Sequence, residues 1–163
     1  MRQQLIKEMK EVFSDDLKRI DHALRVLIYA ETIQKFEGGN PKIVTAAAIL
    51  HDIGIKAAEE KYNSSSGKYQ EIEGPPIAET ILTKLNFGDT EIAHISDIIA
   101  NHHSDKGNDT IEFRCVWDAD WLVNINDEFA ENKTAAQIEK LINKVFKTKT
   151  GKTLALELFI QKV

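Results

Sequence analysis

The sequence predicts an all-α fold, a compact helical bundle, on three observations. Nearly every segment repeats its apolar residues with helical spacing, as the stripe of Ile20, Leu24 and Leu27 illustrates. The breaks between these segments carry residues that begin or end helices, such as Asn40-Pro41. Finally, no stretch alternates apolar and polar residues in the way that favours a β-strand.

Three helices are expected before Asp52. Apolar residues one turn apart in the N-terminal segment predict a short first helix, and either Ser14 or Asp15-Asp16 can cap the second. Gly38-Gly39 is expected to end that second helix, and Asn40-Pro41 supplies a cap and a first residue for the third. The third helix carries the uninterrupted apolar run Ala46–Leu50, which predicts that it is buried.

The remainder of the chain predicts further helices and one polar loop. Residues 62–70, YNSSSGKYQ, are rich in Ser and Gly, which favours a mobile loop that can serve as a lid. Gly74-Pro75-Pro76 is expected to begin the next helix, and a later helix should end at His102-His103, with another from Phe113 to Ile125. We expect one domain, residues 1–163, in which a motif-bearing core of 19–126 is packed against amphipathic helices in 133–163.

Composition excludes several classes of protein. The chain has 163 residues, 42% of them hydrophobic, which suffices to bury a core. Its formal net charge of -5, from 26 acidic and 21 basic residues, offers no electrostatic footprint for nucleic acid. Neither a membrane-spanning apolar run nor a signal-peptide pattern is found, so we expect a soluble, cytoplasmic protein without a membrane partner. The C-terminal lysines are expected to form a solvated helix face.

The single cysteine, Cys115, excludes an intrachain disulfide and a cysteine-rich zinc site. Its neighbours Phe113, Val116 and Trp117 are large and apolar. We therefore expect Cys115 to be a small buried residue of the core rather than a nucleophile.

The end of the third helix poses a chemical problem. Its apolar run stops at His51 and Asp52, and burial of both polar side chains without partners would be costly. Neighbouring residues on a helix point about 100° apart, so both side chains can aim at one point only where the helix ends. Gly54 permits the backbone to turn there. His22, which lies on the apolar stripe of the preceding helix, can point toward the same interior.

Two aspartates lie in the later apolar segment VWDADWLVNI. Because Asp118 and Asp120 are two residues apart, they point roughly 200° apart on a helix, and one of them must find a buried partner or a metal. Two imidazoles and two carboxylates suit a divalent transition metal with positions left open for water or substrate. A structural histidine at His22 remains the alternative.

The ordered set of motifs resembles the HD-domain superfamily of metal-dependent phosphohydrolases. The segments RIDHALRV, AAILHDIG and DADWLVNI are similar to its first histidine motif, its namesake motif and its terminal aspartate motif. The resemblance implies a compact bundle of the HD-domain type. It also implies a divalent metal ion, whether Mn, Fe, Mg, Ni, Co or Zn, held by His22, His51, Asp52 and Asp120, with Asp118 as the alternative to the last.

A second metal is the open point. The segment IIANHHSDKG resembles the part of the cyclic-dinucleotide phosphodiesterase branch that holds a second ion, but the Gly-Tyr-Pro signature of that branch is absent. Many relatives carry a histidine four residues before a glycine at a helix start, where this chain has Gln70, followed by Glu71. We expect one metal by default. We also expect His102-His103, which precede a polar turn, to be exposed and to contact substrate phosphate or a second metal.

The resemblance implies hydrolysis of a phosphate ester or anhydride in a small molecule, a nucleotide above all, by metal-activated water. The expected catalytic residues are Asp52, Glu71, His102, His103 and Lys56. Glu71 can act as a general acid or ligand, or merely favour the dipole of its helix. Two other functions stay open: a di-iron oxygenase of HD type, and a non-catalytic binding module stabilised by its metal. The sequence leaves the oligomeric state open.

Overall fold

The computed structural model describes residues 1–161, and within them the prediction of an all-α fold is confirmed, with no strand. The helices, in chain order, are α1 (Arg2–Phe13), α2 (Leu17–Glu37), α3 (Pro41–Leu50), α4 (Ile55–Tyr62), α5 (Gly67–Lys84), α6 (Asp89–Asn101), α7 (Ile111–Asn124), the π-helical turn η1 (Ile125–Phe129), α8 (Ala135–Val145) and α9 (Lys149–Phe159). None of them is long and apolar enough to cross a membrane.

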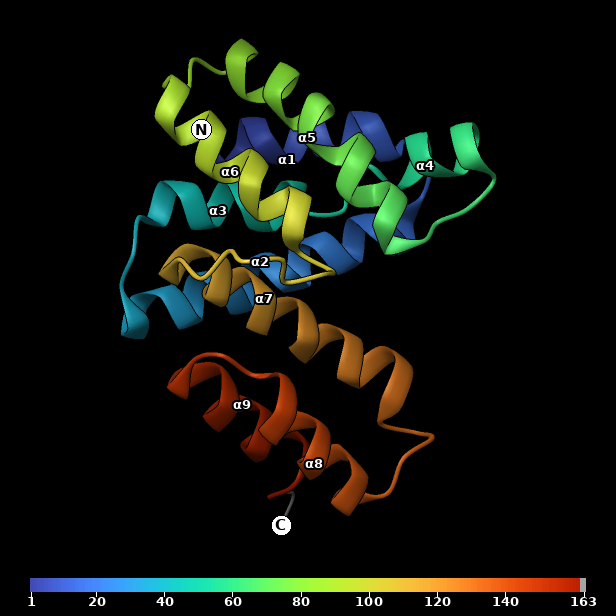
Figure 1. Cartoon of the computed structure of the whole chain (residues 1–163), viewed down its shortest axis with the longest axis vertical. Helices are drawn as coiled ribbons and strands as arrows, with labels where there is room; N and C mark the ends of the chain where they lie inside the picture. Colours follow the sequence, from blue (N-terminus) through green and yellow to red (C-terminus); the bar gives the residue numbers. More distant parts are fainter. Residues whose placement is uncertain (162–163) are drawn as a thin grey trace.

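Helices α2 and α7 pack side by side across the middle of the molecule (Figure 1). Helices α1, α3, α5 and α6 gather on one side of this pair, and the α8–α9 hairpin lies on the other. Helix α3 is buried from Ile43 to Leu50, as its apolar run predicts. One cluster of buried apolar side chains extends from Leu5 of α1 to Ala155 of α9, so the functional motifs lie on helices with a common core.

The predicted caps of the second and third helices are present. The Asp16 carboxylate accepts a hydrogen bond from the backbone N–H of Arg19 at 3.1 Å, which satisfies a free donor of the first turn of α2. Asn40 does the same for the N–H of Lys42 at 3.0 Å, with Pro41 as the first residue of α3. Gly38 ends α2 with a φ of 91°, a left-handed value that favours glycine.

The predicted start of the fifth helix at Gly74 is wrong. Helix α5 begins at Gly67 and runs through Pro75 and Pro76, so only residues 63–66 of the predicted loop lie outside helices. A proline inside a helix removes a backbone hydrogen bond. Here tertiary packing outweighs that loss, because α5 presents one buried face on both sides of the prolines: Gln70, Gly74, Ala78, Ile81 and Leu82.

Asp118 fastens the C-terminal hairpin to α7. Its buried carboxylate accepts hydrogen bonds from the N–H of Lys147 at 2.8 Å and from the N–H and hydroxyl of Thr148, both at 2.7 Å. Glu37 of α2 accepts a further bond from the N–H of Thr150 at 2.7 Å. A Cβ atom on Gly151 would collide with the Asp118 carboxylate. Two carboxylates therefore hold the start of α9. This is favourable because the start of a helix has unpaired N–H donors and the positive end of the helix dipole.

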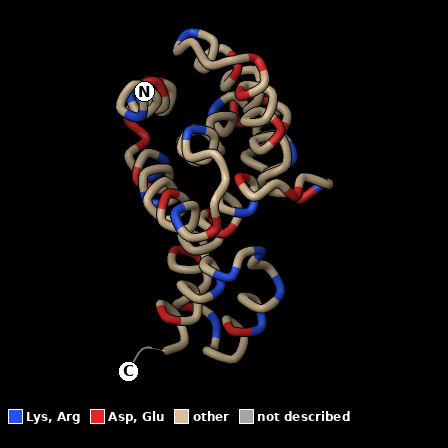
Figure 2. The backbone as a smooth tube through the Cα atoms, turned by 90° about the vertical axis from the view of Figure 1, so that its left-hand side faces the viewer, with Lys and Arg blue, Asp and Glu red and all other residues tan. Residues whose placement is uncertain are grey.

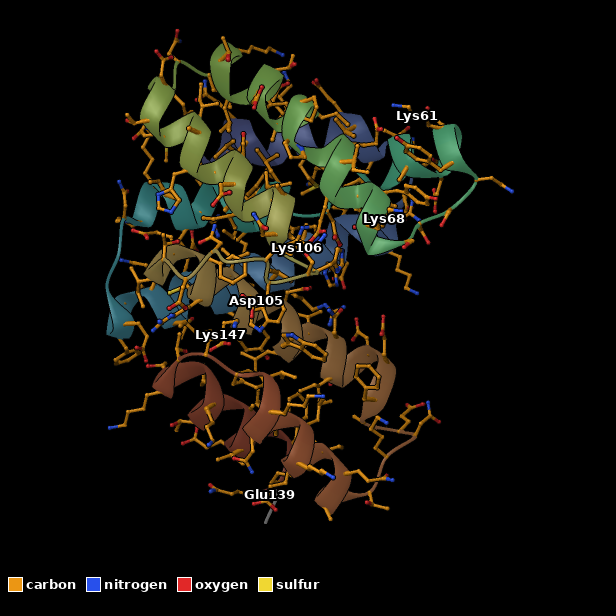
Figure 3. The ribbon with its side chains drawn as sticks, viewed as in Figure 1. Lys61, Lys68, Asp105, Lys106, Glu139 and Lys147 are labelled. Atoms are coloured by element: carbon orange, nitrogen blue, oxygen red, sulfur yellow. The ribbon has the colours of Figure 1, made fainter. Side chains whose placement is uncertain are left out.

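Charged residues are interspersed over the helices (Figure 2). Lys140 and Lys144 are exposed on α8, in agreement with the expected solvated face, but Lys147 pairs with Asp105 at 2.6 Å. That ion pair joins the hairpin to the loop between α6 and α7, where the two side chains lie together (Figure 3).

Cys115 is fully buried, as expected, and burial raises the pKa of its thiol to about 12. We expect it to react negligibly with a thiol reagent at pH 8 in the folded protein and fully in denaturant, because only the thiolate is reactive. Rapid labelling of the native protein at pH 8 would show that α7 is not packed as described.

The same pKa shift links folding stability to pH. Since the pKa of the Cys115 thiol in the folded protein lies above its ordinary value of 9.0, the stability that this group contributes is present below pH 9.0 and is lost toward pH 12.

Candidate metal centre

Four polar side chains from three parts of the chain converge on one point. His22 comes from α2, His51 and Asp52 from the turn between α3 and α4, and Asp120 from α7. His22 Nε2 lies 3.0 Å from Asp120 Oδ1 and 3.2 Å from His51 Nε2. His51 Nε2 lies 3.3 Å from Asp52 Oδ2. These are the residues that the resemblance implies as metal ligands.

The backbone turn at the end of α3 brings His51 and Asp52 to the same point. Gly54 follows them, but its φ of -80° is available to any residue, so our expectation that it serves the turn by its conformational freedom is wrong. Its role is close approach: a Cβ atom there would lie 2.6 Å from the backbone nitrogen of Gly74. The absence of a side chain at Gly54 therefore lets α5 lie directly against the turn that carries the site.

Backbone carbonyls fix the ring orientation of two histidines. His51 Nδ1 donates to the carbonyl oxygen of Ala48 at 2.8 Å, and His102 Nδ1 donates to that of Ile99 at 2.7 Å. A carbonyl oxygen can only accept, so Nδ1 of each ring carries a hydrogen. In the neutral ring Nε2 then has a free lone pair, which is the form that binds metals. His51 Nε2 faces Asp52 Oδ2, and His102 Nε2 faces Asp52 Oδ1.

The electrostatics of this cluster favour a positive charge at its centre. Burial opposes protonation of His51, but the charges and hydrogen bonds of Asp52 and Asp120 outweigh it and raise the pKa of that imidazole well above its ordinary value. Burial also opposes ionisation of the carboxylates, yet hydrogen bonds and charge from the histidines lower the pKa of both Asp52 and Asp120.

The donor set fits a divalent cation. Two imidazole nitrogens that face each other at 3.2 Å repel unless a proton or a metal lies between their lone pairs. Transition metals bind such atoms at about 2.1 Å, which places neighbouring ligand atoms roughly 3.0–3.4 Å apart. The observed separations of 3.0, 3.2 and 3.3 Å lie in that range. His22, His51 and Asp52 thus form a set that can hold a metal ion.

Asp52 also belongs to a second such set, with His102 and His103. Its Oδ1 lies 3.2 Å from His102 Nε2 and 3.9 Å from His103 Nε2, on the opposite side of the carboxylate from His51. His102 is buried, so the expectation that both histidines are exposed is wrong for this one. Its ring packs against the rings of His51 and His103, with centroids 5.4 and 3.9 Å away, while its Nε2 faces Asp52. The side chain of His103 remains 34% exposed.

Gln70 holds His103 in a specific form. The Gln70 amide nitrogen donates to the Ser65 carbonyl oxygen at 2.8 Å, so its own oxygen faces His103 Nε2, 3.0 Å away. His103 Nε2 therefore carries a hydrogen. Burial and the charge of His102 lower the pKa of His103 to about 4, which keeps the ring neutral at pH 7. In this arrangement His103 Nε2 donates a hydrogen bond, and a second metal stays a prediction.

The other predicted catalytic residues lie outside this cluster. The Glu71 carboxylate accepts hydrogen bonds from the N–H of His103 at 3.0 Å and from the N–H and hydroxyl of Ser104, both at 2.8 Å. It thereby holds the end of α6 against α5. Lys56 is half-buried on α4 and does not line the pocket that contains His22 and Asp120. The catalytic roles of Glu71 and Lys56 stay predictions.

The pocket over the site has a volume of about 930 Å³. It is lined by His22, Asp52, His103 and Asp120 together with residues that the sequence did not single out. These include Arg19, one turn before His22, and a group at the end of α7 and in η1. After Asp120 the sequence mixes the aromatic residues Trp121 and Phe129 with amides and carboxylates. That mixture could have indicated a pocket lining from the sequence alone.

Residues 19–125 match the HD domain family. Among solved structures, the chain is similar to a protein described as a predicted HD superfamily hydrolase from an uncultured Thermotogales bacterium, with a TM-score of 0.70 and 22% sequence identity. The similarity covers 95% of this chain and 83% of that one, and it confirms the HD-type helical fold. No curated protein matches the chain.

We predict different roles for the two aspartates of α7, metal binding for Asp120 and structural stability for Asp118. We expect Asp120→Asn to lower metal affinity at least tenfold, about 1.4 kcal/mol, because it removes a charged oxygen next to His22. Asp118→Asn should retain metal but lose about 1–3 kcal/mol of stability, because its amide cannot accept all three bonds from residues 147 and 148. Calorimetric metal titration and thermal melts of both variants check this. The reverse ranking of metal affinities would move the ligand to Asp118.

Proposed function

The chain belongs to the HD domain family, and we propose that it is a metal-dependent phosphohydrolase acting on a small phosphorylated molecule, a nucleotide above all. The observation that carries the proposal is the convergence of His22, His51, Asp52 and Asp120 on one point. All of them except the buried His51 line a pocket of about 930 Å³. A phosphate and its leaving group fit a pocket of that size.

The proposed metal ligands are His22, His51, Asp52 and Asp120. A divalent cation held by them would polarise a phosphoryl oxygen and lower the pKa of a water molecule toward neutrality. The protein residues around it have separate tasks. The backbone carbonyls of Ala48 and Ile99 keep His51 and His102 in the form whose Nε2 atoms face the site.

In this proposal Asp52 orients the attacking water. Its Oδ2 faces His22 and His51, while its Oδ1 faces His102 and His103 on the other side. A carboxylate oxygen at the border of the pocket can accept a proton or a hydrogen bond from water during in-line attack. Neutral His103 can donate its Nε2 hydrogen to a phosphoryl oxygen when substrate replaces Gln70 as the acceptor.

Two cations of the pocket lining are available for phosphate oxygens. Arg19 of α2 lines the pocket and is held by ion pairs with Asp16 at 3.1 Å and Glu59 at 2.5 Å. Lys18 precedes it in the same lining. A guanidinium fixed in this way presents its remaining N–H groups in a set direction, which suits recognition of a phosphate.

The proposal predicts metal-dependent phosphate release. Purified protein should contain at least one divalent transition metal per chain, and it should release phosphate from at least one compound in a screen of mono-, di- and cyclic nucleotides. Chelation should abolish the activity and re-addition of metal should restore it. Retained metal with no phosphate release would favour a binding module, and an iron-dependent optical band with oxygen consumption would favour the oxygenase.

His103 separates catalysis from folding. Because its side chain is partly exposed, His103→Ala should leave the melting temperature nearly unchanged. Phosphate release should fall at least tenfold, about 1.4 kcal/mol of transition-state stabilisation. Metal content, melting temperature and turnover are measured on one preparation. Loss of activity with unchanged metal assigns His103 to substrate, whereas a drop from two metals to one assigns it to a second ion. Full turnover with full metal content would remove it from the site.

A further inference from the structure

The pocket continues beyond the metal centre along one face of α7 and η1. Asp120, Asn124, Glu128 and Glu131 all line it, at successive intervals of four, four and three residues. Asp120 and Asn124 lie one turn apart on α7, Glu128 lies in the π-helical turn η1, and Glu131 lies in the turn that follows it. The lining thus leads from the proposed ligand Asp120 past the end of α7 to Glu131. A leaving group attached to a phosphate at the metal centre would therefore extend along this face.

An aromatic surface borders the same face. The rings of Trp121 and Phe129, both in the pocket lining, are stacked with their centroids 6.3 Å apart and an angle of 23° between their planes. Trp121 follows the proposed ligand Asp120 directly, so this surface begins beside the metal centre. Flat aromatic faces bind ring systems through offset stacking. The Nζ atom of Lys133 lies 5.4 Å from the Phe129 centroid, but Lys133 is not in the pocket lining.

The far part of this face is negatively charged. Asp127 is neutralised by Arg25 of α2, whose two terminal nitrogens lie 2.9 and 2.5 Å from its oxygens. Glu128 and Glu131 are exposed, and neither takes part in an ion pair within residues 1–161. The two lining cations, Lys18 and Arg19, both belong to the start of α2, where we assign them to the phosphate. The charges that η1 and the following turn leave unpaired are the carboxylates of Glu128 and Glu131, so this part of the lining repels anionic groups.

We propose that this wall, formed by Trp121, Asn124, Glu128, Phe129 and Glu131, determines substrate specificity. It selects phosphate monoesters with an uncharged, ring-bearing leaving group of the size of a nucleoside, and it rejects esters with a second anionic group at the far end. The inference rests on the proposed phosphohydrolase function and deepens it. The aromatic pair supplies the attraction for the ring, and the two free glutamates supply the repulsion.

Binding of non-hydrolysable phosphonates tests the wall without turnover. The probes are ethylphosphonate, benzylphosphonate and 4-carboxybenzylphosphonate, titrated calorimetrically into the Mn²⁺-loaded protein. Benzylphosphonate should bind most tightly, by about tenfold over the carboxylated compound, because the added charge faces two carboxylates. Glu128→Gln combined with Glu131→Gln should reduce that difference to about threefold or less. Phe129→Leu should weaken benzylphosphonate and leave ethylphosphonate unchanged.

Glu139→Gln is the matched control, because Glu139 is an exposed carboxylate of α8 that lies at the far end of the hairpin (Figure 3). It should leave all three affinities unchanged. Turnover of phenyl phosphate and adenosine monophosphate is measured in parallel. The expected ranking without any phosphate release would support the wall and refute the phosphohydrolase. Phosphate release with equal or tighter binding of the carboxylated probe would overturn the wall alone. Failure of all three phosphonates to bind would also overturn it.

Discussion

The carboxylate of Asp52 lies between three imidazoles, and the arrangement of the site depends on it. One oxygen faces His22 and His51, and the other faces His102. Such a set of acceptors can remain together in a helical core only if positive charge is shared among them. The raised pKa of His51 and the lowered pKa of Asp52 show that the cluster is stabilised by positive charge. A bound divalent cation can supply that charge in place of a proton.

The rest of the bundle serves to keep these groups in place. Gly54 lets α5 approach the turn after α3, and Gly74 lets Ile99 of α6 pack against α5. Glu71 of α5 holds the end of α6, from which His102 and His103 project. On the other side of α7, Asp118 fixes the α8–α9 hairpin. The two aspartates of α7 thus point in different directions: Asp118 faces the α8–α9 hairpin, and Asp120 faces the pocket.

Sequence patterns were sufficient where a local rule decides the structure. Helical spacing and capping residues predicted α2 and α3 nearly to their ends, and the opposite directions of Asp118 and Asp120 followed from helix geometry. The start of α5 was missed because Pro75 and Pro76 favour a helix start, while the buried face that continues through them depends on contacts with distant residues. Burial of His102 and the Gln70–His103 hydrogen bond likewise depend on how α5 meets α6. No local pattern contains that information.

The most direct test of the central claim is a crystal structure of the protein loaded with Mn²⁺, with diffraction data collected for the anomalous signal of manganese. We expect an anomalous peak at about 2.1–2.3 Å from His22 Nε2, His51 Nε2, and one oxygen each of Asp52 and Asp120. A peak elsewhere, or a folded protein with no peak between these four side chains, would contradict the account.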